Sequence, residues 1–300
     1  MWIQLLLMNA NQSSRTAEYM AFFRALESRK PPGKRLIEDR FAVSLLSPWL
    51  KRAVRWAKLP GFGWLVEQYT DLRLPGARTS AIARTRLIDD AWVSAIHEDI
   101  RQIVILGAGF DCRALRFPET SSAVVYEVDH PATCKLKENR LAQALLAIPG
   151  NVRFAAIDFN REMLAEVLVE SGFSCERPAL FLWEGVTNYL SEGAVDEVLR
   201  FIGTCAPGSR IVFTYVHRGV LDDSVEFFGA ERIRRDVLQL GEPWTFGFEP
   251  VTLAAYLRER NLILDYDADA REYRMKCFGL RSTRMRGYDF YHVAIAHVEL

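Results

Sequence analysis

The sequence predicts an α/β protein, in which a doubly wound, mostly parallel β-sheet has a helical cap before it and an antiparallel hairpin at its end. Residues 13–100 show helical spacing of apolar side chains with short breaks. From residue 101 onward, short apolar runs alternate with helix-length segments, a pattern typical of a parallel sheet covered on both faces. The last two apolar runs have no clear helix between them, which indicates an antiparallel pair of strands at one sheet edge. We therefore divide the chain into a cap, 1–100, and a sheet domain, 101–300.

The cap is expected to consist of several helices. Ser13 and Ser14 are suited to cap a first helix that carries Tyr19, Phe22 and Leu26 on one face. Pro-Gly pairs separate the segments that follow. Further helices are expected at 40–46, 48–58, 63–74 and 80–96.

The sheet domain is expected to contain seven strands. Five parallel strands are predicted at 103–106, 124–128, 152–157, 180–183 and 211–216. Helices are predicted between them at 131–147, 161–171 and 192–205. The tail is predicted to form a helix at 251–260 and strands at 262–266 and 288–297.

Composition narrows the class of protein. The 300 residues include 38 Lys and Arg and 38 Asp and Glu, so the formal charge is zero, which argues against nucleic acid or an anionic membrane as the main partner. The five cysteines are scattered without a C-x-x-C pair, so neither a zinc ribbon nor a disulfide framework is expected. Residues 1–8 are apolar but have no basic flank and are too short for a signal peptide or a membrane span. We expect a cytoplasmic protein with no metal site.

A glycine turn follows the first predicted strand and is the most informative feature of the chain. The apolar run that ends at Leu106 continues directly into Gly107-Ala108-Gly109. Glycines there allow a tight turn and let backbone N–H groups approach a ligand at the carboxyl end of the strand. A dinucleotide fingerprint would have Gly or Ala where Cys112 stands, which weakens the interpretation as a nicotinamide-dependent oxidoreductase. That enzyme class stays an alternative, as does a non-catalytic cofactor-binding sensor.

Acidic residues end the next three predicted strands. Glu127 and Asp129 share one face of the second strand, and either could bind both hydroxyls of a ribose. We favour Asp129, which lies nearer the carboxyl end, although it is also suited to cap the next helix. The pair Asp158-Phe159 suits an adenine, and Glu184 follows the fourth strand. The alternative for each is ordinary solvated loop charge.

Taken together, seven motifs resemble the leucine carboxyl methyltransferase family of S-adenosylmethionine-dependent enzymes. The resemblance spans residues 14–297 and is closest to the bacterial branch of small-molecule carboxyl O-methyltransferases. It implies a class I methyltransferase (Rossmann-like) fold with seven strands, the last of them antiparallel. The motifs are Ala83-Arg84-Thr85, Leu106-Gly-Ala-Gly-Phe-Asp-Cys-Arg113, Glu127-Val-Asp-His-Pro131, Asp158-Phe159, Trp183-Glu-Gly-Val-Thr-Asn-Tyr-Leu190, Asp39-Arg-Phe-Ala42 and Gly241-Glu-Pro-Trp244 with Gly247-Phe248.

The resemblance also implies S-adenosyl-L-methionine as the cofactor and a role for each motif residue. Arg84 corresponds to the position that binds the methionine carboxylate, and Glu184 to the amino-acid end of the cofactor. Asp129 corresponds to the ribose position. The remaining cofactor residues are Gly107 and Gly109 at the cofactor backbone and Asp158 and Phe159 at the adenine.

The position of Arg84 also has a physical argument. In the helix expected at 80–96, Arg84 shares one stripe with Ile88, Ala91 and Ala95, so it points where the apolar face points. A buried guanidinium needs an anionic partner. A ligand carboxylate would satisfy it, and so would an acidic side chain of the sheet domain.

The acceptor is expected to be the carboxylate of a small molecule. A carboxylate is already ionised at pH 7 and needs no general base. A hydroxyl acceptor would need one, for which Tyr189 and His217 are the candidates. A protein C-terminal carboxylate is a further alternative. Tyr215, Trp244 and Phe248 are predicted to line the acceptor pocket, with plain core packing as the alternative.

Overall fold

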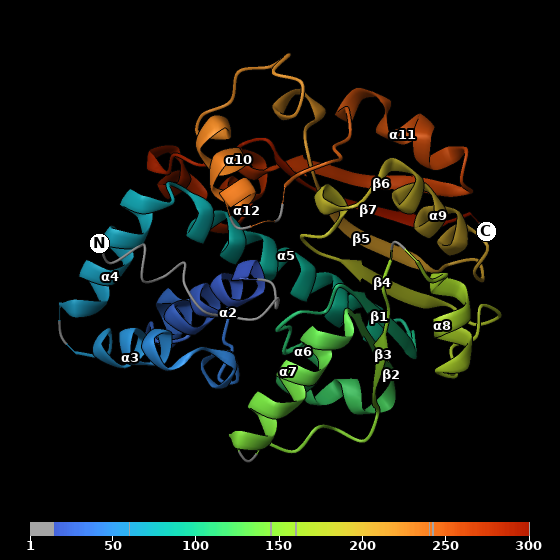
Figure 1. The fold of residues 1–300 in the computed structure, drawn as a ribbon, viewed down its shortest axis with the longest axis horizontal. Helices are drawn as coiled ribbons and strands as arrows, with labels where there is room; N and C mark the ends of the chain where they lie inside the picture. Colours follow the sequence, from blue (N-terminus) through green and yellow to red (C-terminus); the bar gives the residue numbers. More distant parts are fainter. Residues whose placement is uncertain are drawn as a thin grey trace.

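The computed structural model describes residues 15–59, 61–144, 146–159, 161–239, 241 and 243–299. The predicted caps Ser13 and Ser14 lie outside these residues. Seven strands form one sheet in the order β3-β2-β1-β4-β5-β7-β6 (Figure 1). Strands β1 to β5 are parallel, while β7 runs antiparallel to both β5 and β6. The predicted fold class is therefore confirmed.

Each predicted strand is present, with small shifts at its ends. The order of the strands reverses between β1 and β4, and ligands of open α/β sheets bind at such a switch point. The strands are β1 (Gln102–Leu106), β2 (Val124–Asp129), β3 (Val152–Ala156), β4 (Ala179–Trp183), β5 (Arg210–Val216), β6 (Leu262–Asp269) and β7 (Tyr291–Val298).

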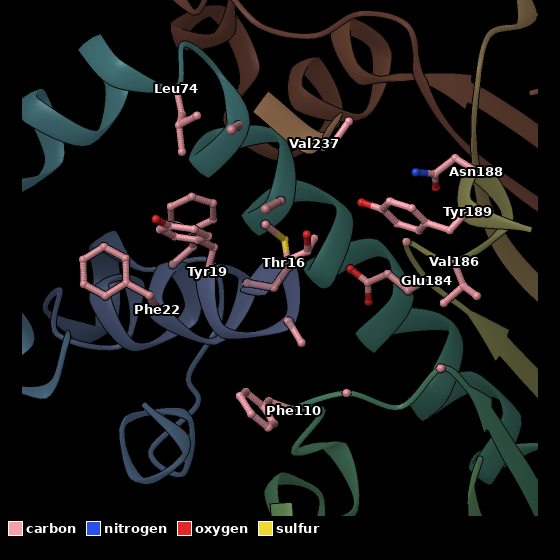
Figure 2. A pocket seen from close by; sticks show the side chains of 18 of the residues that line it. Thr16, Tyr19, Phe22, Leu74, Phe110, Glu184, Val186, Asn188, Tyr189 and Val237 are labelled. Atoms are coloured by element: carbon pink, nitrogen blue, oxygen red, sulfur yellow. The ribbon is translucent and has the colours of Figure 1, made fainter. Parts of the chain in front are cut away.

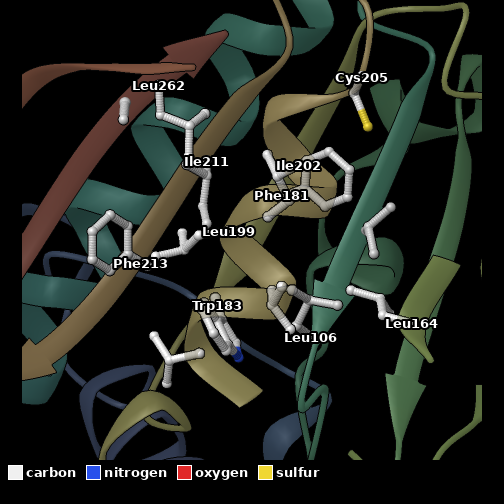
Figure 3. Packing of buried hydrophobic residues seen from close by; sticks show 14 of the residues in the cluster. Leu106, Leu164, Phe181, Trp183, Leu199, Ile202, Cys205, Ile211, Phe213 and Leu262 are labelled. Carbon is white, nitrogen blue, oxygen red and sulfur yellow. The ribbon is translucent and has the colours of Figure 1, made fainter. Parts of the chain in front are cut away.

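A layer of helices covers each face of the sheet. Side chains alternate between the two faces along each strand, so apolar strands present apolar surface on both faces. Figure 3 shows Phe181 and Trp183 of β4 packed with Leu199 and Ile202 of α9 on one face. On the other face, alternate β-strand residues such as Leu182 pack against α5 and α12. The helices of the sheet domain are α6 (Arg113–Arg116), α7 (Pro131–Gln143), α8 (Leu164–Glu170), α9 (Glu192–Gly203), α10 (Ala230–Gln239), α11 (Pro250–Arg258) and α12 (Ala270–Phe278).

The cap helices lie together at one side of the molecule, and α5 runs from them onto the sheet (Figure 1). The cap shares its core with the sheet domain, because Phe110 and Leu141 pack among its apolar side chains. The cap helices are α2 (Arg15–Glu27), α3 (Pro48–Trp56), α4 (Phe62–Arg73) and α5 (Ala77–His97). Short 3-10 helices are η1 (Pro32–Lys34), η2 (Ala42–Leu45), η3 (Pro118–Ser122), η4 (Thr187–Tyr189), η5 (Arg218–Val220) and η6 (Gly279–Arg284).

Three helices, α6, α10 and α12, were not expected from the sequence, and the segment at 40–46 is a 3-10 turn rather than an α-helix. The hairpin prediction was wrong in its connection, since α12 stands between β6 and β7. Asp269 and Glu272 form a capping box at the start of α12, a local signal that reveals the helix. None of the described helices is both long and apolar enough to cross a bilayer.

Candidate functional site

A cavity of about 1250 Å³ opens at the carboxyl ends of β1, β2, β3 and β4, where the strand order reverses. It lies between the sheet and the helices α2, α4, α5 and α10 (Figure 2). The structure brings together all the side chains and glycines predicted for the cofactor. They are Arg84, Gly107, Gly109, Asp129, Asp158, Phe159 and Glu184.

The glycine turn brings the backbone to the wall of this cavity. Gly107 and Gly109 have φ of +66° and +48°, a conformation that side chains other than glycine rarely adopt. A Cβ at Gly107 would lie 2.2 Å from Cγ2 of Val186, in the loop after β4. The N–H groups of Gly107 and Ala108 donate to the carbonyl of Val128, which anchors the turn to β2. The turn therefore has no room for a side chain at position 107.

Asp129, not Glu127, reaches the cavity. The Asp129 carboxylate accepts hydrogen bonds from the N–H groups of Gly109 and His130, and burial raises its pKa above the ordinary value. Glu127 is 4% exposed and forms an ion pair with Lys137 of α7, away from the cavity. The N-terminal capping residue of α7 is His130, whose Nδ1 accepts a hydrogen bond from the N–H of Ala132. Asp129 therefore does not have this role.

Arg84 and Glu184 form an ion pair at the cavity wall. Nε of Arg84 donates to Oε1 of Glu184 at 2.9 Å, so the alternative expected for Arg84, a pairing with an acid of the sheet domain, is present. Burial opposes ionisation of Glu184, but Arg84 and Arg113 lower its pKa below the ordinary value. Nη2 of Arg84 reaches the sulfur of Met20 at 3.5 Å, a weak acceptor. The guanidinium therefore keeps donor capacity for a stronger anionic partner.

Arg113 is a site residue that the sequence analysis missed. It is 3% exposed, and Nη2 lies 3.3 Å from Oε2 of Glu184. Nε donates to Asp89 of α5 at 2.9 Å, and the Asp111 carboxylate accepts from the N–H of Arg113 at 2.6 Å. This network holds Glu184 from the side opposite Arg84. The signal in the sequence is Asp111-Cys-Arg113 directly after the glycine turn.

The end of the cavity predicted for adenine is formed by the loop after β3. Asp158 and Phe159 both line the cavity, and the ring of Phe159 packs against the core of the sheet domain. The N–H of Asp158 donates to Oε2 of Glu162 at 2.8 Å, which stabilises the turn. An acidic side chain and an aromatic face are thus placed side by side.

Aromatic hydroxyl groups line another part of the cavity. Tyr189, predicted from the sequence, lies there with Asn188 on the loop after β4 (Figure 2). Tyr288 and Tyr291, which the sequence analysis missed, also line it. Burial raises the pKa of Tyr288 to about 12, so its hydroxyl is a proton donor at neutral pH. Among the described residues this buried hydroxyl has no hydrogen-bond partner.

Four predicted residues do not line the cavity, which corrects the expected pocket. Tyr215 is buried in the sheet and donates to Oδ2 of Asp267 at 2.7 Å. Phe248 packs on Tyr215 with ring centroids 5.4 Å apart. The ring of Trp244 packs edge-on against Tyr291, outside the cavity lining.

The fourth is His217, one of the two general-base candidates. Its Nδ1 accepts from the N–H of Gly219 at 3.0 Å, and Nε2 lies 3.4 Å from Glu249. Both ring nitrogens therefore have structural partners, and burial lowers its pKa. A group of three or more His, Cys, Asp or Glu side chains that could hold a metal ion is not found within the described ranges.

The order of the strands and a cavity at their switch point define a Rossmann-like class I methyltransferase fold. The sequence model of the leucine carboxyl methyltransferase family matches residues 17–203. The chain belongs to this family.

Curated relatives cover most of the chain. A protein of Mycobacterium avium is 33% identical over 266 residues, which span 86% of this chain and 82% of that protein. One from Mycolicibacterium paratuberculosis is 38% identical over 214 residues, 69% of this chain and 67% of its own. Each is named "Putative S-adenosyl-L-methionine-dependent methyltransferase".

Solved structures show the same fold at low sequence identity. A DUF574 family protein of Streptomyces avermitilis superposes with a TM-score of 0.59 at 15% identity, over 95% of this chain and 98% of that one. A protein of Thermobifida fusca described as a "putative methyltransferase" gives a TM-score of 0.59 at 16% identity, over 97% and 100%. These likenesses concern the fold alone.

Proposed function

We propose that the chain is an S-adenosyl-L-methionine-dependent methyltransferase that methylates the carboxylate of a small molecule. The observation that carries the proposal is the Arg84–Glu184 pair beside the glycine turn in one cavity. A basic and an acidic side chain next to each other fit the carboxylate and the ammonium group of an amino acid. Asp129 lies at the end of the neighbouring strand β2. Family membership and the names of the relatives support the same cofactor.

The residues present suit each part of that cofactor. The spare donors of Arg84 fit its carboxylate, and Glu184 fits its ammonium group. A carboxylate has about four lone-pair positions, and backbone N–H groups use two on Asp129. The side chain of Thr133 also hydrogen-bonds this carboxylate, and the remaining position is open to a ribose hydroxyl. Asp158 and Phe159 offer an acceptor and an apolar face for adenine.

A carboxylate acceptor agrees with the groups around the cavity. When bound, the cofactor would supply a methyl group on a sulfonium, which requires an acceptor oxygen with a free electron pair. An ionised carboxylate has that electron pair without losing a proton. Of the two base candidates, His217 lies off the cavity, whereas Tyr189 lines it. Burial holds the pKa of Tyr291 well above its ordinary value, so Tyr291 is not a suitable base. The protein's own contribution is alignment and exclusion of water.

The structure disfavours the nicotinamide alternative. Dinucleotide folds bind the pyrophosphate at the N-terminus of the helix after the glycine turn. Here that helix, α6, has only four residues. Its first N–H group, that of Arg113, already donates a hydrogen bond to the carboxylate of Asp111. A second anion would be repelled at that place.

Mass spectrometry tests the proposal directly. Purified protein with S-adenosylmethionine is incubated with panels of carboxylic acids, hydroxylated compounds that lack a carboxylate, and short peptides with free C-termini. We expect a gain of one methyl group on members of the first panel, as an ester that alkali hydrolyses. Methylation confined to the hydroxylated compounds or to the peptides would contradict the choice of acceptor. Failure to bind the cofactor by calorimetry would contradict the proposal as a whole.

A further inference from the structure

The cavity extends beyond the cofactor residues into the helical cap. Side chains of α2, α3 and α4 line this extension, here termed the cap chamber. Figure 2 shows Tyr19 and Phe22 of α2 across the cavity from Glu184 and Tyr189. The cap chamber is defined by Tyr19, Phe22, Leu50, Phe62, Leu65 and Tyr69.

The cap chamber is apolar. Arg24 and Arg73 are the charged side chains that α2, α3 and α4 contribute to the cavity wall within the described residues. Arg24 is already held by Asp39 at 2.9 Å and by the carbonyl of Phe110. The guanidinium of Arg73 lies 6.0 Å from the ring centre of Tyr69. This part of the cavity therefore offers apolar contact area and few polar partners for a ligand.

The chamber has a buried base and an exposed rim. Phe22 and Leu50 are 6% and 2% exposed. In contrast, Phe62, Leu65 and Tyr69 on α4 are 45%, 52% and 55% exposed. Large apolar side chains that contact water beside a cavity gain free energy when an apolar ligand covers them. A flexible chain of methylene groups would cover both the rim and the base.

We propose that the cap chamber binds the apolar chain of the methyl acceptor, so that the acceptor class is an amphipathic carboxylic acid with a long aliphatic tail. The inference rests on the proposed function, because the carboxylate of such an acid is the group to be methylated. The two ends of the cavity match the two ends of the molecule. Tyr189, on the loop after β4, lines the cavity outside the cap chamber and suits the carboxylate.

Binding of a homologous series tests the chamber independently of catalysis. Hexanoate, octanoate, decanoate and dodecanoate are titrated into the full-length protein saturated with S-adenosylhomocysteine, and Kd is measured by calorimetry. Each buried methylene is worth up to about 0.8 kcal/mol, so we expect affinity to rise roughly two- to fourfold for each one added. An affinity that does not change along the series overturns the proposal.

Two leucines of α4 form a matched pair of variants. Leu65 lines the chamber, whereas Leu72 is 73% exposed and does not. Both are surface positions, so L65Q and L72Q should fold, which thermal unfolding checks. We expect L65Q to weaken decanoate binding roughly fivefold, since covering half a leucine is worth about 1 kcal/mol, and L72Q to leave it unchanged. An equal effect of the two substitutions on decanoate binding overturns the proposal.

The experiments separate this inference from the proposed function. If short and long acids are methylated with the same kcat/KM, the methyltransferase stands and the chamber proposal fails. If affinity rises with chain length in protein without added S-adenosylhomocysteine but S-adenosylmethionine does not bind, the chamber proposal is supported and the proposed function fails.

Discussion

The role of Asp129 makes a sharp prediction about cofactor binding. Its carboxylate lies at the cavity and accepts two backbone N–H groups, one from Gly109 in the glycine turn and one from His130. D129N replaces one of the two carboxylate oxygens with an NH2 group, which cannot accept a hydrogen bond. The variant therefore loses either a bond from a backbone N–H group or a bond from the ribose. A hydrogen bond to a charged group is worth about 1.5–3 kcal/mol. Loss of one such bond should weaken S-adenosylmethionine binding about 10- to 150-fold.

Calorimetric titration of S-adenosylmethionine measures this change, and Glu127 provides the control. It lies two residues away on the same face of β2 but is paired with Lys137 in the interior. E127Q should lower the unfolding temperature and leave the Kd of the folded protein within about twofold of the wild type. An unchanged Kd in D129N, or an equal loss in both variants, would refute the assignment of the ribose position.

Three further predictions concern the same cavity. R84K keeps the charge but loses the planar fork, so it should weaken S-adenosylmethionine binding roughly tenfold or more in the same titration; wild-type affinity would contradict its contact with the cofactor. Because Glu184 has a lowered pKa when folded, its stabilisation is present above its ordinary pKa near 4.5 and is lost as pH falls through the folded value. E184Q should therefore cost about 1.5–3 kcal/mol of unfolding free energy at pH 7 and progressively less as the pH falls below 4.5, as measured by thermal melts across pH; a loss independent of pH would count against the ion pair. H217A should leave kcat unchanged, since His217 does not line the cavity, and a large fall in kcat with the fold intact would restore it as a base.

Local sequence patterns were sufficient for most of the sheet. Short apolar runs predicted every strand, most clearly the central strands β1 and β4, which are buried at every position and are therefore almost wholly apolar. The helices α6, α10 and α12 were missed, the last because the final two strands were expected to have no helix between them. Helix α10 does have apolar residues at helical spacing, but charged residues dominate the segment and only Ala230 and Val237 are buried.

The predictions for the acceptor pocket show where such patterns fail. Tyr215 in the fifth strand and Phe248 in the later aromatic motif were predicted to line the pocket, but both pack in the core of the sheet domain. Two aromatic residues that do line the cavity and were not predicted are Tyr288, just before β7, and Tyr291 at its start. That strand lies beside β5 only because the chain returns after α12 to pair between β5 and β6. Distance along the chain carries no information about such a return.

The sequence by itself determined the α/β fold, the glycine turn and the acidic residues at the strand ends, because each depends on residues close together in the chain. It could not separate Glu127 from Asp129, which have the same strand parity. The tertiary structure did so by placing Lys137 against one and the cavity against the other. The ion pair of Arg84 with Glu184 joins residues 100 positions apart. Such long-range contacts, and the apolar chamber formed by α2, α3 and α4, exist only once the cap is packed on the sheet.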